Sequence, residues 1–225
     1  MIQLYELCGA DDKLLFSPHC WKVRLSLAHK GLDYETLPVG FSEIGAIEGG
    51  SGKVPVLRDG ETVVNDSLEI ALYLDRTYPD APVLVRDLPL TRFVINWSQT
   101  QLHPAVARHA LMDIYKLLSP TDQDYFRTTR EKLFGMTLEE FDAKFPKDGK
   151  ELAAALVPLA VTLKGQTFLG GESPDFADYV VFGALQWLRV TASVDVVPQE
   201  GPVAEWFARL LDMYDGDGRS VPKAA

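Results

Sequence analysis

Ser17 and Pro18 begin a segment of the sequence whose residue types could bind an anion. Pro18 suits the first position of a helix, because its missing N–H would have no hydrogen-bond partner there. Ser17 then caps the helix, and the free amides of the first turn and the helix dipole make the space beside it electropositive. Its hydroxyl can donate a hydrogen bond into that space. The segment therefore predicts either a site for an anion such as a thiolate or a cap with a structural role alone.

The residues on either side of Ser17 predict the elements that must position it. Residues 2–7 alternate between apolar and polar side chains, as a half-buried strand does. An apolar stripe with helical spacing follows, formed by Trp21, Leu25 and Ala28. We therefore expect Ser17 on the connection between a strand and a helix, where α/β folds place binding groups.

The composition narrows the class of protein. A chain of 225 residues with 47% hydrophobic and 24% charged residues is typical of a globular protein with a substantial core. Its net charge of −10, with no basic run, argues against binding to nucleic acid or to an anionic membrane surface. No leader and no long apolar stretch precede or interrupt the first elements, so we expect a cytoplasmic protein with no membrane partner.

The cysteines predict buried thiols. Cys8 and Cys20 are too few for a disulfide framework, and a small buried thiol is the default for each in a reducing compartment. Cys20 stands at the second cysteine position of a CxxC redox pair, but Ser17 occupies the first. A dithiol reductase is therefore disfavoured.

Two other motif classes are also disfavoured. The segment 45–54 resembles a phosphate loop at its Gly–Lys end, but Ile47 stands where glycine is needed and Val54 where serine or threonine is needed. The four histidines have no metal-like spacing with carboxylates or cysteines, which predicts surface or packing roles for them and no metal site. They are His19, His29, His103 and His109.

The elements together predict a mixed α/β unit followed by an all-helical one. Strands are expected at 34–39, 54–57 and 61–64, and a helix from Ser67 to about Tyr78, with Asp66 as its cap and Glu69 completing a capping box. This βαβ–ββα order is typical of a mixed sheet of about four strands covered by helices. Prolines make 81–89 the linker between domains 1–80 and 90–225. The later helices are expected at 90–118 with an interruption at Pro104, 121–133, 150–164, 176–191 behind an Asp175–Asp178 capping box, and 203–214.

Several motifs resemble those of a known family. SPHCWKVRLSLAHKG, GFSEI, KVPVL and YLDRTYPD occur in this order on the predicted elements, and the chain resembles the glutathione transferase superfamily over nearly its whole length. These details are most similar to the bacterial β-etherases and the fungal etherase-like class. The resemblance implies a thioredoxin-like N-terminal domain, an all-α C-terminal helical bundle, a serine-type site and a homodimer.

The resemblance also implies where glutathione binds. A residue before proline is held extended, so Val54 can present its backbone to an extended peptide, and the family has a cis bond at the matching Pro55. In the family, an acid and a serine matching Asp66 and Ser67 hold the γ-glutamyl end, although most members carry Glu or Gln in place of this aspartate. Lys53 could pair with a carboxylate of the ligand.

Ser17 is then expected to stabilise the glutathione thiolate. A cysteinyl thiol has a pKa of about 8.5, and lowering it by two units requires about 2.7 kcal/mol. One hydrogen bond to a charged group supplies ~1.5 to 3 kcal/mol and a helix N-terminus ~0.3 to 1. No adjacent base is visible that would make Ser17 a covalent nucleophile.

The second substrate is expected to be a hydrophobic electrophile bound between the domains. The candidate contacts come from two places in the sequence. They are Trp97 and Gln101 on the first helix of the second domain, and Trp21 and Phe41 beside the thiol site. Cleavage of an aromatic ether is the narrower form of this hypothesis. Two alternatives stay open: glutathione-dependent thiol transfer through an exposed Cys20 of lowered pKa, and a noncatalytic binding module with the same fold.

Overall fold

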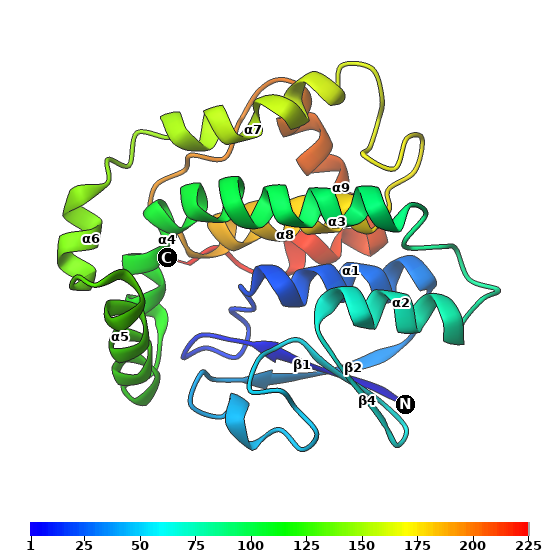
Figure 1. Cartoon of the computed structure of the whole chain (residues 1–225), viewed down its shortest axis with the longest axis horizontal. Helices are drawn as coiled ribbons and strands as arrows, with labels where there is room; N and C mark the ends of the chain where they lie inside the picture. Colours follow the sequence, from blue (N-terminus) through cyan, green and yellow to red (C-terminus); the bar gives the residue numbers. More distant parts are fainter. Residues whose placement is uncertain (225) are drawn as a thin grey trace.

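The computed structural model describes residues 1–224, and its first part is built on a four-stranded mixed sheet of order β2-β1-β3-β4 (Figure 1). β1 (Ile2–Leu7) pairs in parallel with β2 (Tyr34–Val39) and antiparallel with β3 (Val56–Asp59), which pairs antiparallel with β4 (Thr62–Asn65). The predicted mixed sheet is confirmed. β3 begins two residues later than expected, because Pro55 has no N–H to donate to the ladder.

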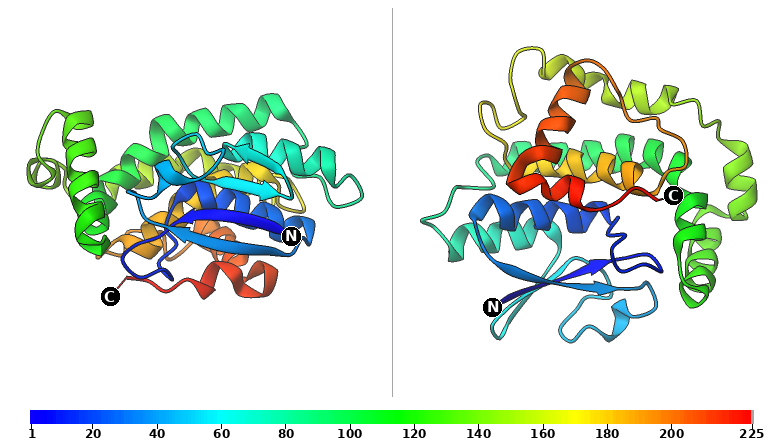
Figure 2. Two further views of the ribbon diagram at one scale, coloured as in Figure 1. Left: turned by 90° about the horizontal axis from the view of Figure 1, so that it is seen from below. Right: turned by 180° about the vertical axis from the view of Figure 1, so that it is seen from behind.

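Two helices cover one face of this sheet. α1 (Pro18–Lys30) and α2 (Ser67–Thr77) form a layer between the sheet and the remaining helices (Figure 1). The view from below brings the strands to the front, with helices behind them (Figure 2, left). Because α1 is sandwiched between two layers, most of its side chains are buried on both sides. The start of this helix is consequently held by both parts of the chain.

The rest of the chain is helical, as predicted. α3 (Leu88–Trp97) starts two residues earlier than expected and runs through a π-helical turn, η2 (Ser98–Leu102), into α4 (His103–Leu117). The interruption expected at Pro104 takes the form of this π-helical turn, which ends two residues before the proline, and Pro104 itself lies in the first turn of α4. The other elements are η1 (Ile44–Ala46), α5 (Pro120–Phe134), the unpredicted α6 (Leu138–Lys144), α7 (Lys150–Thr162), α8 (Phe176–Thr191) and α9 (Pro202–Ser220), which is broken at 213–216.

α8 is the central helix of the second part and is almost wholly buried. Its predicted Asp175–Asp178 capping box is confirmed, and Asp178 also accepts from the indole N–H of Trp206 at 2.7 Å. Gly183 lets α8 approach α1, because a Cβ at this position would overlap the carbonyl oxygen of Pro18. The packing of α8 therefore fixes the N-terminal turn of α1, where Ser17 lies.

Across residues 1–224, none of the helices has the length and apolar character needed to cross a bilayer.

Candidate functional site

Ser17 occupies the predicted cap position at the start of α1. Its Oγ accepts a hydrogen bond from the backbone N–H of Cys20 at 3.3 Å, and the residue is 4% exposed. Because Oγ accepts this bond, the hydroxyl proton remains available to another acceptor. Ser17 also lines a cavity of about 460 Å³, so its environment is enclosed but reachable by a ligand.

A second cavity, of about 770 Å³, brings together the residues predicted to bind the peptide: Lys53, Val54, Pro55, Asp66 and Ser67. We call it the polar cavity. The Val54–Pro55 bond is cis, as the resemblance implies. Asp66 caps α2 through Oδ1, which accepts from the N–H groups of Leu68 at 2.8 Å and Glu69 at 3.3 Å. The reciprocal bond expected from the Glu69 side chain is not among the contacts of residues 1–224, so the capping box is only half formed.

The cavity beside Ser17 is mainly aromatic and aliphatic, and we call it the apolar cavity. Its aromatic lining includes Phe16, Phe41, Tyr125, Phe126 and Phe134. His19, Lys53 and Val54 line both cavities. The two cavities therefore adjoin at the first turn of α1.

Phe41 lies in the apolar cavity, where it was predicted to contact the substrate. The Asp122 carboxylate accepts from the N–H of Ser42 at 2.7 Å and so ties the loop after β2 to α5. Gly40 permits this approach, because a Cβ there would overlap the same carboxylate. The Phe41 ring then packs against Phe126 of α5, with a centroid distance of 5.4 Å.

A buried cation and a neutral imidazole lie where the cavities meet. The Lys22 Nζ is 3.1 Å from His19 Nδ1, and burial lowers the pKa of Lys22 to about 8, while nearby Asp66 acts to raise it. Burial, aided by Lys22 and His103, lowers the pKa of His19 well below its usual range. With Nδ1 accepting from the ammonium, the ring of His19 carries its proton on Nε2.

His19 and His103, predicted as surface or packing residues, do pack against each other, and they also lie in the wall of a cavity. Both line the apolar cavity, with their ring centroids 5.3 Å apart. The buried Nε2 of His103 and Nε1 of Trp187 have no hydrogen-bond partner among residues 1–224. A signal was present in the three-residue spacing of His19 and Lys22, which places them on one face of a helix.

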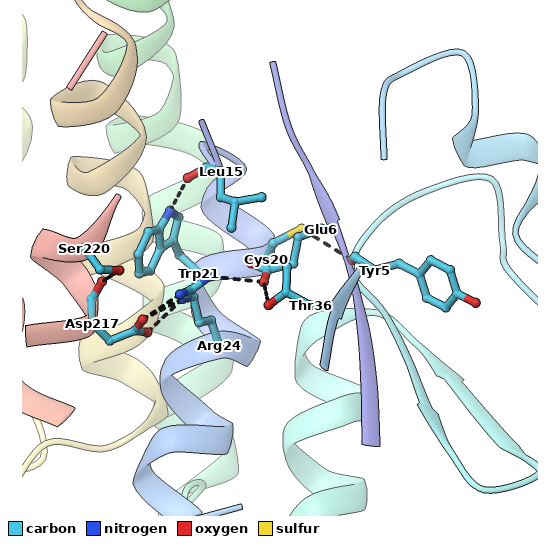
Figure 3. A network of polar contacts seen from close by, with 9 residues as sticks. All are labelled: Tyr5, Glu6, Leu15, Cys20, Trp21, Arg24, Thr36, Asp217 and Ser220. Atoms are coloured by element: carbon cyan, nitrogen blue, oxygen red, sulfur yellow. Dashed lines mark hydrogen bonds and ion pairs between the residues drawn. The ribbon is translucent and has the colours of Figure 1, made fainter. Parts of the chain in front are cut away.

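Trp21 is a core residue, so its prediction as a substrate contact is wrong. It is 0% exposed, and its Nε1 donates to the Leu15 carbonyl at 2.9 Å (Figure 3). Its ring meets Phe182 edge-on, with a centroid distance of 5.8 Å. Four residues after Ser17, the helix has turned this side chain towards α8. Trp21 is close to Ser17 in sequence but does not line the apolar cavity.

The structure also separates Trp97 and Gln101 from the site. Both line a third cavity, of about 500 Å³, between α3–α4 and α7, and none of its lining residues belongs to the polar or the apolar cavity. The opposite face of the same helical segment reaches the polar cavity through Arg92, Asn96 and Gln99. The predicted Trp97 and Gln101 thus lie on the face of this segment that is turned away from the polar cavity.

Cys20 does not meet the condition for thiol transfer. It is 1% exposed, its Sγ is directed at the Tyr5 carbonyl, and burial raises the pKa of its thiol to about 12 (Figure 3). Cys8 is likewise buried and free. The prediction of two buried thiols is confirmed. Among the described residues, no group of three His, Cys, Asp or Glu side chains is arranged to hold a metal ion.

Comparison with known proteins places this geometry in a family. Residues 13–82 match the family model "Glutathione S-transferase, N-terminal domain", and residues 89–212 match "Glutathione S-transferase, C-terminal domain". The chain belongs to the glutathione S-transferase family. Its fold is accordingly an N-terminal thioredoxin-like domain with a mixed sheet, followed by an all-helical domain.

Individual relatives and structures agree with this assignment. "Glutathione S-transferase Z1" of Arabidopsis thaliana is 46% identical over 77 residues, which is 30% of this chain and only about a third (33%) of that relative's length. Glutathione transferase GSTFuA2 from Phanerochaete chrysosporium has a TM-score of 0.75 at 28% identity, with 96% of this chain and 93% of that one covered. CsGST63524 of Ceriporiopsis subvermispora, solved in complex with glutathione, has a TM-score of 0.77 at 25% identity, with 99% of both chains covered.

Proposed function

We propose that this protein is a serine-type glutathione transferase in which Ser17 stabilises the glutathione thiolate for attack on a hydrophobic electrophile. One observation carries the proposal: the buried Ser17 hydroxyl, at the N-terminus of α1, opens onto the apolar cavity where that cavity adjoins the polar one. Family membership and a structural neighbour solved with glutathione support the choice of peptide. The first 80 residues would then bind glutathione, and residues 90–225 would contribute the electrophile pocket.

Glutathione would occupy the polar cavity. Its backbone would pair with Val54, its γ-glutamyl end would meet the start of α2 at Asp66 and Ser67, and Lys53 would pair with a carboxylate. Both hydrogen bonds from backbone N–H groups to Asp66 go to Oδ1, which leaves Oδ2 for the ligand amine. The short aspartate can therefore cap the helix and contact the ligand at the same time.

The chemistry requires a thiolate at the junction of the cavities. The Ser17 hydroxyl can donate to the sulfur while its oxygen keeps the cap bond to Cys20. One such charged hydrogen bond contributes about 1.5 to 3 kcal/mol, against about 2.7 kcal/mol needed to lower the thiol pKa by two units. The sulfur then attacks an electrophile held by the aromatic walls of the apolar cavity. Cleavage of an aryl ether, as in the etherase-like class, is a narrower form of this reaction.

We also propose a homodimer formed through the outer faces of α3 and α7. Four large apolar side chains are exposed there: Leu90 at 54%, Phe93 at 68%, Val157 at 55% and Val161 at 61%. Leu90 and Phe93 line a groove of about 420 Å³ whose other wall includes Pro158, Leu159 and Thr162 of α7. Exposed apolar side chains around a groove are typical of a surface covered by a partner, and the family resemblance favours a second copy of the chain.

Replacement of Ser17 by Ala tests the proposed role of the hydroxyl. We expect the pKa of bound glutathione, followed by the ultraviolet absorbance of the thiolate, to return towards that of the free thiol, and turnover at neutral pH to fall on the order of 100-fold. Ser17→Thr, which keeps a hydroxyl, is the matched control and should retain most of the activity. An unchanged thiol pKa and unchanged turnover in Ser17→Ala would refute the role. Retention of the wild type on glutathione resin, with no turnover of a broad electrophile panel, would instead indicate a binding module.

A further inference from the structure

Arg130 of α5 is a cation in the wall of the apolar cavity without a counterion. Its guanidinium carbon lies 4.9 Å from the ring centroid of Phe126 and 5.6 Å from that of Phe41. Its side chain makes one hydrogen bond, to the Thr129 hydroxyl at 3.2 Å, and no carboxylate of residues 1–224 lies within 4.0 Å of it. Burial lowers the pKa of Arg130, and Tyr125 alone opposes that effect.

Most other half-buried arginines of residues 1–224 have a carboxylate partner, and Arg189, which has none, donates instead to the Val221 carbonyl at 3.1 Å and to Gln186 Oε1 at 3.5 Å. Arg127, less than one turn earlier on the same helix, pairs with Glu131 and Glu139, each at 2.8 Å. Arg24 pairs with Asp217, and Arg108 with Glu151. A cation taken out of water without a counterion is destabilising, so a protein rarely keeps one in a cavity wall unless a ligand completes the pair. The chain as a whole repels anions, because its net charge is −10. The unpaired Arg130 is therefore not part of a generally basic surface.

We propose that Arg130 binds a carboxylate carried by the electrophile, so that the second substrate is an aromatic acid. This inference rests on the proposed function and names the substrate class of the same site. The planar guanidinium can bind a carboxylate through two parallel hydrogen bonds, and the rings of Phe41 and Tyr125 stack beside it to receive an aromatic ring. Ser17 and His19 line the same cavity, so the electrophilic carbon would face the thiolate while the carboxylate meets Arg130.

A matched pair of electrophiles tests the proposal: a chlorodinitrobenzoate with chlorine para to the carboxyl carbon, and the corresponding chlorodinitrobenzamide. In each reaction the thiolate sulfur forms a C–S bond to the chlorine-bearing carbon, and chloride leaves with the electrons of the C–Cl bond. The thiol proton passes to solvent when the thiolate forms. The two probes differ at the position that would face Arg130, and each enzymatic rate is divided by the uncatalysed rate to remove their difference in intrinsic reactivity.

We expect Arg130→Met to lower kcat/KM for the benzoate on the order of 10- to 100-fold, the range of a lost charged hydrogen bond, and to change the benzamide less than about threefold. Lys132→Met is the control, because it removes the same charge from an exposed position on α5. It should affect neither probe selectively. Equal losses for both probes, or a loss explained by a raised KM for glutathione, would overturn the proposal.

A binding measurement separates this proposal from the proposed function. The glutathione conjugates of the acid and of the amide are prepared chemically, and their Kd values are measured on the wild type and on Arg130→Met. The wild type should bind the acid conjugate more tightly, and the variant should lose that preference. A wild type that binds both conjugates equally would refute the role of Arg130 whether or not the protein turns over. Preferential binding of the acid with no turnover would refute the transferase function and leave the anion site standing.

Discussion

Replacing Glu6 with Gln should change how stability depends on pH. Glu6 of β1 is 0% exposed and accepts from the Thr36 hydroxyl at 3.1 Å, while its Oε2 has no partner among residues 1–224. Arg24 reaches its other oxygen at 3.4 Å but is committed to Asp217, with bonds of 2.6 and 2.8 Å (Figure 3). Burial therefore outweighs the attraction of Arg24 and raises the pKa of Glu6 to about 7.

The size and sign of the effect follow from that value. The carboxyl has a pKa of about 7 in the folded chain and 4.5 as a free side chain, a separation that corresponds to about 3 kcal/mol. Between these two pKa values the folded state binds more protons than the unfolded state, so the free energy of unfolding falls as pH rises through this window. A glutamine at position 6 keeps the shape and has no proton to lose. Glu6→Gln should therefore gain about 3 kcal/mol relative to the wild type between about pH 4.5 and pH 8.

Urea unfolding at a series of pH values measures this difference. The control is Glu35→Gln on the neighbouring strand, which removes an exposed carboxylate and should show no comparable trend. A constant difference between wild type and Glu6→Gln across the series would show that Glu6 is ionised throughout and that Arg24 compensates its burial. A difference that shrinks with rising pH would refute the reasoning outright.

Two further predictions concern α3 and the helical segment that continues it. Trp97→Ala and Gln101→Ala should leave kcat and KM for the electrophile within about twofold of wild type, because both residues line a cavity separate from the site; a tenfold rise in that KM would contradict the placement. Phe93→Glu should convert the proposed dimer to monomer in sedimentation experiments, because it places a charge in an apolar interface. Val194→Glu, at another exposed apolar position, is its control, and a Phe93→Glu variant that stays dimeric would exclude the α3–α7 face.

Much of the fold and several residues that line the polar cavity could be predicted because their signals are local. Prolines and capping side chains mark helix starts at Ser17, Asp66 and Asp175, and all three positions are helix caps in the structure. The peptide-site residues follow one another along the backbone at 53–55 and 66–67. Once the strand and the helix form, their relative positions are set.

The residues that the helical domain contributes to the candidate site could not be predicted, because they depend on which way each helix faces. The choice of Trp97 and Gln101 required the phase of a long helical segment, and the π-helical turn at 98–102 alters that phase by an amount that Pro104 alone does not specify. Nothing in the sequence distinguishes Arg130 from Arg127, which lies on the same helix. Only the packing of α5 against the loop after β2 shows that one is paired with acids and the other faces the cavity.

The position of Ser17 depends on the helical domain as much as on the sheet that precedes it. The start of α1 touches α8 where Gly183 has no side chain, the Trp21 ring packs on Phe182, and Arg24 is bound to Asp217 near the end of the chain. These contacts lie along successive turns of α1, so moving the helical domain would move the cap of this helix and the cavity it faces. The candidate site at Ser17 is therefore positioned by the packing of the two domains, and the sequence around Ser17 does not position it alone.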